Sequence, residues 1–345
     1  MGPRFVYAGD SSSDLPIWHA AEAAVLVGVT ATTKTSVLAT TKIEKEFTNE
    51  PAGLRAWLKA LRIHQWSKNL LLFVPLFTAF EFGDSVKLLS AMLAFVSFSL
   101  AASATYMLND LWDLESDREH PRKRNRPFAN AQIPLIQGIT MAGSLLVIAL
   151  CLAMWMSYAF AWMIFGYVVL TTAYSWIFKR YVLIDVLMLA MLYTFRVLAG
   201  AVATGITVTP WLLAFSIFTF FSLALVKRCA ELVSLQSSGR QHSNGRDYRV
   251  SDLVVLWPLG ISASLCSVVI FGLFIGSPGA ALRYANVDIL WLVGVGLIYW
   301  IARLWIKTSR GEMHDDPIVF AARDFGSRLT LLAMLALTVF AHFLG

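Results

Sequence analysis

Charged residues are scarce in this chain, at 14% of its 345 residues, against about 25% in an average soluble domain. Hydrophobic residues make up 57%, with 23 Phe and 12 Trp, which excludes a soluble globular enzyme and a disordered tail. The three cysteines, Cys151, Cys229 and Cys266, have no metal-ligand spacing, so a disulfide scaffold is excluded and we expect small core residues. The composition predicts an integral membrane protein.

Long apolar runs divide the chain into membrane spans of roughly 20 residues each. They predict an all-α, polytopic fold with nine transmembrane helices. The predicted spans cover residues 66–82, 88–109, 136–157, 160–178, 184–203, 211–229, 252–274, 287–306 and 326–344.

The distribution of Lys and Arg predicts the orientation of these spans. Nearly all basic loop residues fall on alternate loops, and the loops between them hold only Lys87 and Arg283. Basic residues are retained on the cytoplasmic side, so the N-terminus is predicted to be cytoplasmic and the C-terminus external. The net charge of +6 therefore indicates topology and requires no nucleic-acid partner. We expect the inner (cytoplasmic) membrane of a prokaryote, with the site facing the cytoplasm.

Residues before the first span have a different composition, and the chain divides into three expected parts: 1–28, a polar linker over 29–53, and the transmembrane domain 54–345. Residues 5–28 follow a strand, turn, helix, strand pattern. The run Gly9-Asp10-Ser-Ser-Ser-Asp14 resembles motif IV of haloacid dehalogenase phosphohydrolases, whose acids hold Mg²⁺. Nothing upstream supplies the nucleophilic Asp-x-Asp strand. We therefore expect residues 1–28 to be a C-terminal remnant of such a domain, with Asp10 and Asp14 inert.

The most informative motif is Asn109-Asp110-Leu-Trp-Asp113-Leu-Glu-Ser-Asp117, at the inner end of the second span. At about 100° per residue, Asn109, Asp113 and Asp117 lie within roughly an 80° arc, with Asp110 beside them. Three oxygen-bearing side chains favour Mg²⁺ over zinc, and Mg²⁺ is usually shared with substrate phosphates. A solvated helix end is the plain alternative, but acids at membrane depth are costly and tend to mark functional sites.

A basic run follows at once, from Arg118 through Lys123 and Arg126 to Pro127 and including Arg122. Taken alone it favours positive-inside anchoring, whereas beside the acidic face it favours phosphate binding. Asp185 and Arg196 share a face of the fifth span about 16 Å apart, too far to pair directly. Each needs a partner elsewhere: an inter-helix salt bridge and a functional role are about equally favoured for Arg196, and Asp185 is expected to face the site.

The string NDLWDLESDREHPRKRNRPFA closely resembles the first aspartate-rich motif and basic loop of the UbiA superfamily of intramembrane prenyltransferases. Two further runs match, Leu61–Asn69 with Lys68, and Tyr174–Arg180 with Lys179. The resemblance covers roughly residues 54–345 and implies a UbiA-type bundle that binds a phosphorylated isoprenoid with Mg²⁺.

One departure from the aromatic prenyltransferases narrows the resemblance. Those enzymes carry a second D-x-x-x-D motif after the sixth span, where this chain has Lys227-Arg228-Cys-Ala-Glu231. That pattern, the REHPRKRNRP run and the segment Asp316–Asp324 are similar to the branch represented by decaprenyl-phosphate phosphoribosyltransferase. The resemblance implies transfer of 5-phosphoribose from phosphoribosyl pyrophosphate (PRPP) to a polyprenyl phosphate.

These observations together define the expected site. The expected catalytic residues are Asp110, Asp113, Asp117 and Asp185, and the expected Mg²⁺ ligands are Asn109, Asp113 and Asp117. The residues expected to bind substrate phosphates are Lys68, Arg118, Lys123, Arg126, Tyr174, Lys179, Arg196, Lys227, Arg228 and Glu231.

Two other functions remain open at this point. The first keeps the fold and transfers a polyprenyl diphosphate to an aromatic or other acceptor, which the missing second acidic motif disfavours. The second is a lipid or ion transporter without catalysis. Transporters spread polar residues across the membrane, whereas here these residues gather at the predicted cytoplasmic ends.

Overall fold

The computed structural model describes residues 5–47, 52–120, 123–239, 241, 246–313 and 316–343. Among the basic loop residues, Arg122 and Arg240 lie outside the described residues. The chain divides into two compact units, Met1–Trp57 and Leu58–Gly345.

The first unit is a small parallel sheet with helices between its strands. In chain order it contains β1 (Val6–Gly9), α1 (Leu15–Ala20), β2 (Ala23–Val27), α2 (Ala31–Leu38) and β3 (Lys42–Phe47). The strand order is β1-β2-β3, and both neighbouring pairs are parallel. Trp18, Ala24, Leu26 and Val37 form its small core. The strand, turn, helix, strand pattern predicted for residues 5–28 is confirmed.

The polar linker predicted over residues 29–53 is wrong for residues 31–47, which form α2 and β3. The Thr30 hydroxyl accepts the Thr33 N–H and starts α2, and Val37 packs into the core. The polar strand β3 gains its backbone hydrogen bonds from β2, with Ala23 opposite Lys42. The polar composition of this segment therefore does not reveal its helix, which buries one hydrophobic residue in the core, or its edge strand.

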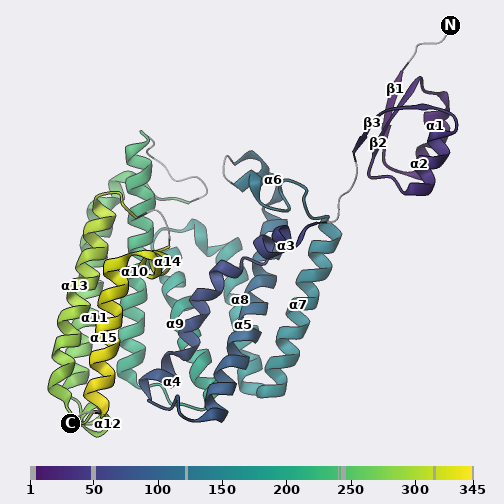
Figure 1. The fold of residues 1–345 in the computed structure, drawn as a ribbon. Helices are drawn as coiled ribbons and strands as arrows, with labels where there is room; N and C mark the ends of the chain where they lie inside the picture. The colour runs from purple at the N-terminus through teal and green to yellow at the C-terminus, as the bar shows by residue number, and fades with distance from the viewer. Residues whose placement is uncertain are drawn as a thin grey trace. The chain divides into compact units, whose positions relative to one another are not determined.

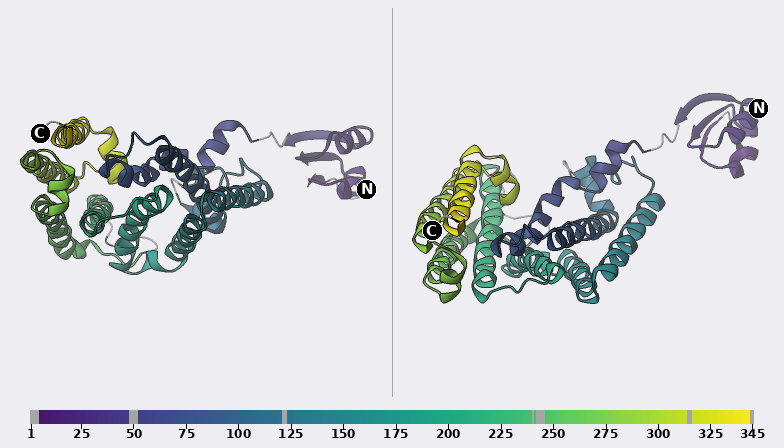
Figure 2. Two further views of the ribbon diagram at one scale, coloured as in Figure 1. Left: turned by 90° about the horizontal axis from the view of Figure 1, so that it is seen from below. Right: turned by 60° about the horizontal axis from the view of Figure 1, so that its bottom comes forward.

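The second unit is a helical bundle, shown in Figures 1 and 2. Within the residues that the structure describes, eight of its helices are long and apolar enough to cross a membrane. They confirm the polytopic all-α prediction for this unit and match eight predicted spans closely. These helices are α5 (Ser85–Trp112), α7 (Leu135–Met156), α8 (Tyr158–Trp176), α9 (Ile184–Thr204), α10 (Pro210–Ser237), α11 (Leu253–Ile275), α13 (Leu290–Ser309) and α15 (Phe325–Phe343).

Short elements connect the long helices. They are α3 (Leu54–Ala60), α4 (Val74–Thr78), α6 (Leu114–Glu119), α12 (Pro278–Arg283), α14 (Pro317–Arg323) and the 3-10 helix η2 (Ile63–Phe73). Three hydrophobic clusters of described residues hold the bundle together: one joins α5, α7, α8 and α9, a second joins α9, α10, α11 and α13, and a third joins α11, α12, α13 and α15. Of the cysteines, only Cys229 is a core residue; Cys151 and Cys266 are exposed on apolar helix faces, so the core prediction was wrong for these two.

The first predicted span, residues 66–82, is not a regular transmembrane α-helix, so the count of nine is not confirmed. This stretch is the 11-residue η2 followed by the five-residue α4. A 3-10 helix rises about 2.0 Å per residue against 1.5 Å in an α-helix, so the two rise roughly 30 Å, about the thickness of the hydrocarbon core. Arg62 contacts Asp110 before η2 begins, and the Thr78 carbonyl accepts from Arg283 where α4 ends. This segment therefore runs the length of the bundle in an extended form (Figure 1).

Candidate active site

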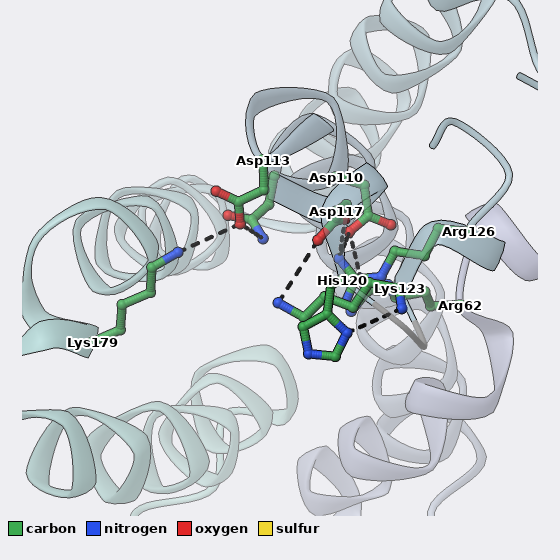
Figure 3. Close-up of polar contacts among 9 residues, drawn as sticks. Arg62, Asp110, Asp113, Asp117, His120, Lys123, Arg126 and Lys179 are labelled. Atoms are coloured by element: carbon green, nitrogen blue, oxygen red, sulfur yellow. Dashed lines mark hydrogen bonds and ion pairs between the residues drawn. The ribbon is translucent and has the colours of Figure 1, made fainter. Parts of the chain in front are cut away.

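The acidic motif lies where α5 ends, and its helix is interrupted at Asp113. Asp113 has φ −85° and ψ 13°, outside the helical range, and α6 begins at the next residue. The single helical face predicted for Asn109, Asp113 and Asp117 is therefore divided. Asp110 and Asp117 point to one side, and Asp113 points to the other, toward Lys179 (Figure 3). Asn109 lies with Asp113, its Nδ2 3.5 Å from Asp113 Oδ2. We call this end of the bundle the acidic end.

Asp110 and Asp117 share one guanidinium. Arg126 Nη1 lies 3.0 Å from Asp110 Oδ1 and 2.5 Å from Asp117 Oδ2. Arg62 Nη2 donates to Asp110 Oδ1 at 2.5 Å, and Lys123 Nζ lies 3.7 Å from Asp117 Oδ1. Both carboxylates are buried, so these cations offset a desolvation cost that an unpaired acid would bear in full. Asp110 is thus joined to Asp117 through Arg126.

Arg62 was not predicted to belong to the site. Its backbone is left-handed, with φ 51° and ψ 44°, and this turn joins α3 to η2. A non-glycine residue in this conformation costs about 1–2 kcal/mol, which the contact of its side chain with buried Asp110 offsets. Residues held in such strained conformations cluster at functional sites. The sequence signal for Arg62 is its place in the run Leu61–Asn69, in which only Lys68 is predicted to belong to the site.

Asn109 and Asp113 face Lys179. Asn109 Nδ2 and Lys179 Nζ each lie 3.5 Å from Asp113 Oδ2. The rings of Trp112 and Trp176 stack with centroids 4.9 Å apart, which fixes the end of α5 against the end of α8. Lys179, three residues beyond Trp176, is thereby held opposite the acids.

The oxygen atoms at the acidic end fit a divalent cation that is shared with a substrate. Asn109 Oδ1 and Asp117 Oδ1 are buried and accept no hydrogen bond within the described chain. Orphaned buried acceptors are rare and call for an explanation, such as an ion. In the part of the chain that the structure describes, no three His, Cys, Asp or Glu side chains gather to hold a metal by themselves. A cation here would need substrate oxygens to complete its coordination, as Mg²⁺ commonly does.

A second polar cluster is centred on Asp316, which directly precedes α14. Asp316 Oδ2 accepts from Lys68 Nζ at 2.8 Å and from the Tyr193 hydroxyl at 3.1 Å, and it lies 3.7 Å from Lys227 Nζ. The other oxygen, Oδ1, accepts the Ile318 N–H and caps α14. Burial alone would raise the pKa of Asp316, but Lys68 and Lys227 outweigh it, so the pKa lies below its usual value.

Neither Asp316 nor Tyr193 was assigned a site role from sequence. The sequence signal at Asp316 is an Asp-Pro pair, which is typical of a helix start and does not by itself indicate a site. Lys68 and Lys227, which were predicted, are both in this cluster, on η2 and α10.

Asp185 lies in a third cluster, which is buried. It is fully buried and pairs with Arg228, while the Tyr248 hydroxyl donates to its Oδ1 at 2.5 Å. Arg228 also pairs with Glu231, and Arg246 Nη1 lies 3.5 Å from Glu231. Tyr174 lies beside Arg246. Asp185, Arg228 and Glu231 are thus close together, but both terminal nitrogens of Arg228 are already engaged by protein carboxylates.

Arg196 lies deep in α9 and has no carboxylate partner among the described residues. Its Nε donates to Asn69 Oδ1 at 3.0 Å, Nη1 to the Leu192 carbonyl at 2.6 Å, and Nη2 to the Tyr167 hydroxyl at 3.1 Å. The inter-helix salt bridge considered for this residue is therefore absent from the described structure, and neutral groups on η2 and α8 take its place. Arg118 is exposed, and its Nε lies 3.4 Å from the Ala129 carbonyl.

An apolar groove adjoins the Asp316 cluster. It has a volume of about 410 Å³ and is lined by η2, α9, α10, α13, α14 and α15, with Ser67, Leu223 and Ile318 next to the cluster. A second cavity of about 220 Å³ shares Leu212 and Phe215 with it and ends at Arg283. The two cavities therefore lie next to each other, one beside the Asp316 cluster and the other beside Arg283.

Known proteins are similar to this chain in sequence and in fold. The UbiA prenyltransferase family model matches residues 70–332. The decaprenyl-phosphate phosphoribosyltransferase of Mycobacterium tuberculosis is 35% identical over 300 residues, which cover 85% of this chain and 96% of that protein. The nodulation protein NoeC of Azorhizobium caulinodans is 36% identical, over 81% of this chain and 91% of its own length.

A longer relative and a solved structure add to this. The uncharacterized protein y4nM of Sinorhizobium fredii is 39% identical over 93% of this chain, and the chain spans only 62% of that protein's length. A UbiA homolog from Archaeoglobus fulgidus, solved with GPP and Mg²⁺, has a TM-score of 0.62 at 16% identity, over 82% of this chain and 99% of its own. This likeness shows the fold alone. From the family match and the relatives above 30% identity, the chain belongs to the UbiA prenyltransferase family and is an integral membrane transferase.

Proposed function

We propose that this protein transfers 5-phosphoribose from PRPP to a polyprenyl phosphate and releases pyrophosphate, with Mg²⁺ as cofactor. The observation that carries the proposal is that the acidic end holds two polar clusters with different ligand groups. One cluster offers carboxylate and amide oxygens, and the other offers Lys68 and Lys227 around a single carboxylate. Two different phosphate groups, one bound through a metal and one directly, suit such a pair of clusters.

The donor would bind at Asn109, Asp113 and Asp117. A bound Mg²⁺ would neutralise the charge that develops on the leaving pyrophosphate. Lys179 and Lys123 lie at the rim of these acids and would contact the remaining phosphate oxygens. Arg126, held between Asp110 and Asp117, would keep both carboxylates in place. Asp110 is already neutralised by two guanidiniums, so it contributes less charge to a cation than Asp113 does.

The acceptor lipid would lie with its chain in the apolar groove and its head group at the Asp316 cluster. In the transfer step, the bond between ribose C1 and the pyrophosphate oxygen breaks, and its electron pair leaves with the pyrophosphate. An oxygen of the lipid phosphate forms the new bond to C1. The acceptor attacks as an anion, so no side-chain base is required. The protein's residues would position both phosphates and stabilise charge.

The buried group of Asp185, Arg228 and Glu231 would serve this site by fixing α9 against α10. These two helices carry Tyr193 and Lys227 to the Asp316 cluster. The basic loops around the acidic end support a cytoplasmic active site in a prokaryotic inner membrane.

One assay tests the proposal. Purified protein with Mg²⁺ is supplied either with labelled PRPP and polyprenyl phosphate, or with labelled polyprenyl diphosphate and aromatic acids. We expect lipid-extractable label from the first pair and none from the second. A prenylated aromatic product with no ribosylated lipid would refute the proposal in favour of the alternative donor.

A further inference from the structure

The charged side chains at the acidic end form three groups with different net charge. In the buried group, Asp185 and Glu231 balance Arg228 and Arg246. In the acidic motif, three carboxylates form ion pairs with four cations. The carboxylates are Asp110, Asp113 and Asp117, and the cations are Arg62, Lys123, Arg126 and Lys179. In the third group, Asp316 is the one carboxylate among the described residues that forms an ion pair with Lys68 and Lys227.

Arg196 adds a third cation to this last group. Its guanidinium lies 5.6 Å from the centre of the Tyr193 ring, and Lys68 Nζ lies 5.8 Å from the same centre. The Tyr193 hydroxyl in turn donates to Asp316. The cluster of Lys68, Lys227, Arg196 and Asp316 therefore has three positive charges and one negative charge within the described residues, and two positive charges remain uncompensated.

Lys227 has unused hydrogen-bond donors. Its ammonium is 3.7 Å from Asp316, beyond hydrogen-bond distance, and it donates to no other group in the described ranges of the chain. Its side chain is 34% exposed, whereas that of Lys68 is 11% exposed and hydrogen-bonded to Asp316. An ammonium that has no hydrogen-bond partner among the described residues and lies beside an apolar groove is suited to bind a ligand anion.

We infer that a phosphate monoester, the head group of the acceptor lipid, binds between Lys68 and Lys227, and that Asp316 sets the charge of this site to match it. The inference rests on the proposed function, since it concerns the acceptor of that reaction. A phosphate monoester carries about −1.5 to −2 at neutral pH, which balances the cluster. A diphosphate ester is more negative and leaves an excess of negative charge while Asp316 is present.

The neighbouring groove assigns this phosphate to a lipid. Leu223 lies one helical turn before Lys227, Ser67 precedes Lys68, and Ile318 follows the Asp316-Pro pair; all three line the groove. A lipid phosphate held by the two lysines would extend its first isoprene units directly into this groove. The 5-phosphate of PRPP has the same chemistry but no apolar chain, so the experiment includes ribose 5-phosphate as a separate arm.

The test measures binding to the full-length protein in detergent with EDTA present, so that no divalent cation bridges the ligand. The ligands are farnesyl phosphate, farnesyl diphosphate and ribose 5-phosphate, compared by titration calorimetry. We expect the wild type to bind farnesyl phosphate most tightly. Asp316→Asn adds one net positive charge next to the ligand and should shift the preference toward farnesyl diphosphate by at least about tenfold.

Asp324→Asn is the matched control. Asp324 precedes α15 and accepts the Ser327 N–H, just as Asp316 caps α14. It pairs with Arg303, and neither residue lines the groove. Asparagine can cap a helix, so both variants retain their helix starts. The control should keep the wild-type ratio of affinities. Lys227→Gln should weaken farnesyl phosphate binding at least about tenfold and provides a second test that leaves the Asp316 to Lys68 contact intact.

Three outcomes would overturn the inference: an unchanged ratio in Asp316→Asn, an equal shift in Asp324→Asn, or tighter binding of ribose 5-phosphate than of farnesyl phosphate. The assay contains no PRPP and requires no turnover. The predicted binding pattern without ribosyl transfer would refute only the proposed function, whereas transfer without the binding pattern would refute only this inference.

Discussion

Single residues of the acidic motif differ sharply in what surrounds them. Asp117 is 1% exposed and has one oxygen without a hydrogen bond, and Asp113 faces Lys179. Glu115, between them in sequence, is exposed on the other side of α6. A helical spacing of about 100° per residue places Glu115 on another face than Asn109, Asp113 and Asp117, in agreement with its exposure. The motif spacing goes no further than this. It could not show that the helix is interrupted at Asp113, because the residues that pair with each carboxylate are distant in sequence, such as Arg62 and Lys179.

Asp113→Asn and Asp117→Asn should each lower Mg²⁺-dependent turnover at least about 100-fold, because each removes a charged oxygen ligand and its metal affinity. Glu115→Gln, on the same short helix, should retain near wild-type activity. Initial rates at several Mg²⁺ concentrations, on protein that elutes as a single detergent-solubilised species, measure this. Full activity in both aspartate variants would rule out the assigned metal site.

Asp316 gives a prediction about pH. Its pKa is lower in the folded protein than its usual value near 3.8, because Lys68 and Lys227 outweigh its burial. A depressed folded pKa contributes stability above the unfolded pKa, and this contribution is lost as pH falls through the folded value. The difference in unfolding temperature between wild type and Asp316→Asn should thus be constant from about pH 5 to 8 and shrink below about pH 4. Thermal unfolding in detergent measures it, and a difference that fades between pH 8 and 5 would contradict the assigned contacts.

At the scale of elements, the packing of η2 on α9 places the Asp316 cluster. Gly200 on α9 lies so close to η2 that an added Cβ would be 2.0 Å from the Leu72 carbonyl oxygen. On the other side, Asn69 of η2 bonds Arg196 of α9 and Ser99 of α5. Hydropathy predicts that this segment spans the membrane, but it cannot show that the segment is a 3-10 helix, because an apolar run is equally compatible with a 3-10 helix and an α-helix. The hydrogen bonds of Asn69 could not be predicted from the sequence either, since its partners lie on other helices.

Gly200→Ala should therefore destabilise the protein by about 2–4 kcal/mol, because backbone atoms must move to admit the methyl group. The displaced η2 carries Lys68, so the apparent affinity for the acceptor should fall as well. Gly143→Ala on α7 is the control, since nothing lies within 4 Å of its added Cβ. Helix propensity alone favours alanine by about 1 kcal/mol at such a site. Equal unfolding temperatures for the two variants would contradict the close packing of Gly200 against the Leu72 carbonyl.

At the scale of the whole molecule, nearly all basic loop residues fall on alternate loops between the long helices. Composition and periodicity predicted eight of the long helices, because a bilayer constrains length and polarity strongly. The sheet of the first unit was predicted only through β2. The third strand is polar and short, so its presence depends on pairing with β2 and leaves no hydrophobic pattern of its own.

The orientation can be tested by labelling introduced cysteines on intact cells. Ser277 lies between α11 and α12, near Arg283, and Ser238 follows α10 near the acidic end. We expect a membrane-impermeant maleimide to label Ser277→Cys on intact cells and Ser238→Cys only after permeabilisation, with the wild type giving the background of native cysteines. The reverse pattern would invert the predicted topology.

The most direct test of the proposed reaction measures, in one reaction mixture, how much labelled lipid forms and how much pyrophosphate is released. Purified protein receives PRPP labelled in both its ribose and its 5-phosphate, together with polyprenyl phosphate and Mg²⁺. We predict that both labels enter the lipid fraction in equal amounts, that one pyrophosphate is released for each labelled lipid, and that Asp113→Asn forms neither product. Pyrophosphate release without labelled lipid, or lipid labelled in only one position, would contradict the proposed transfer.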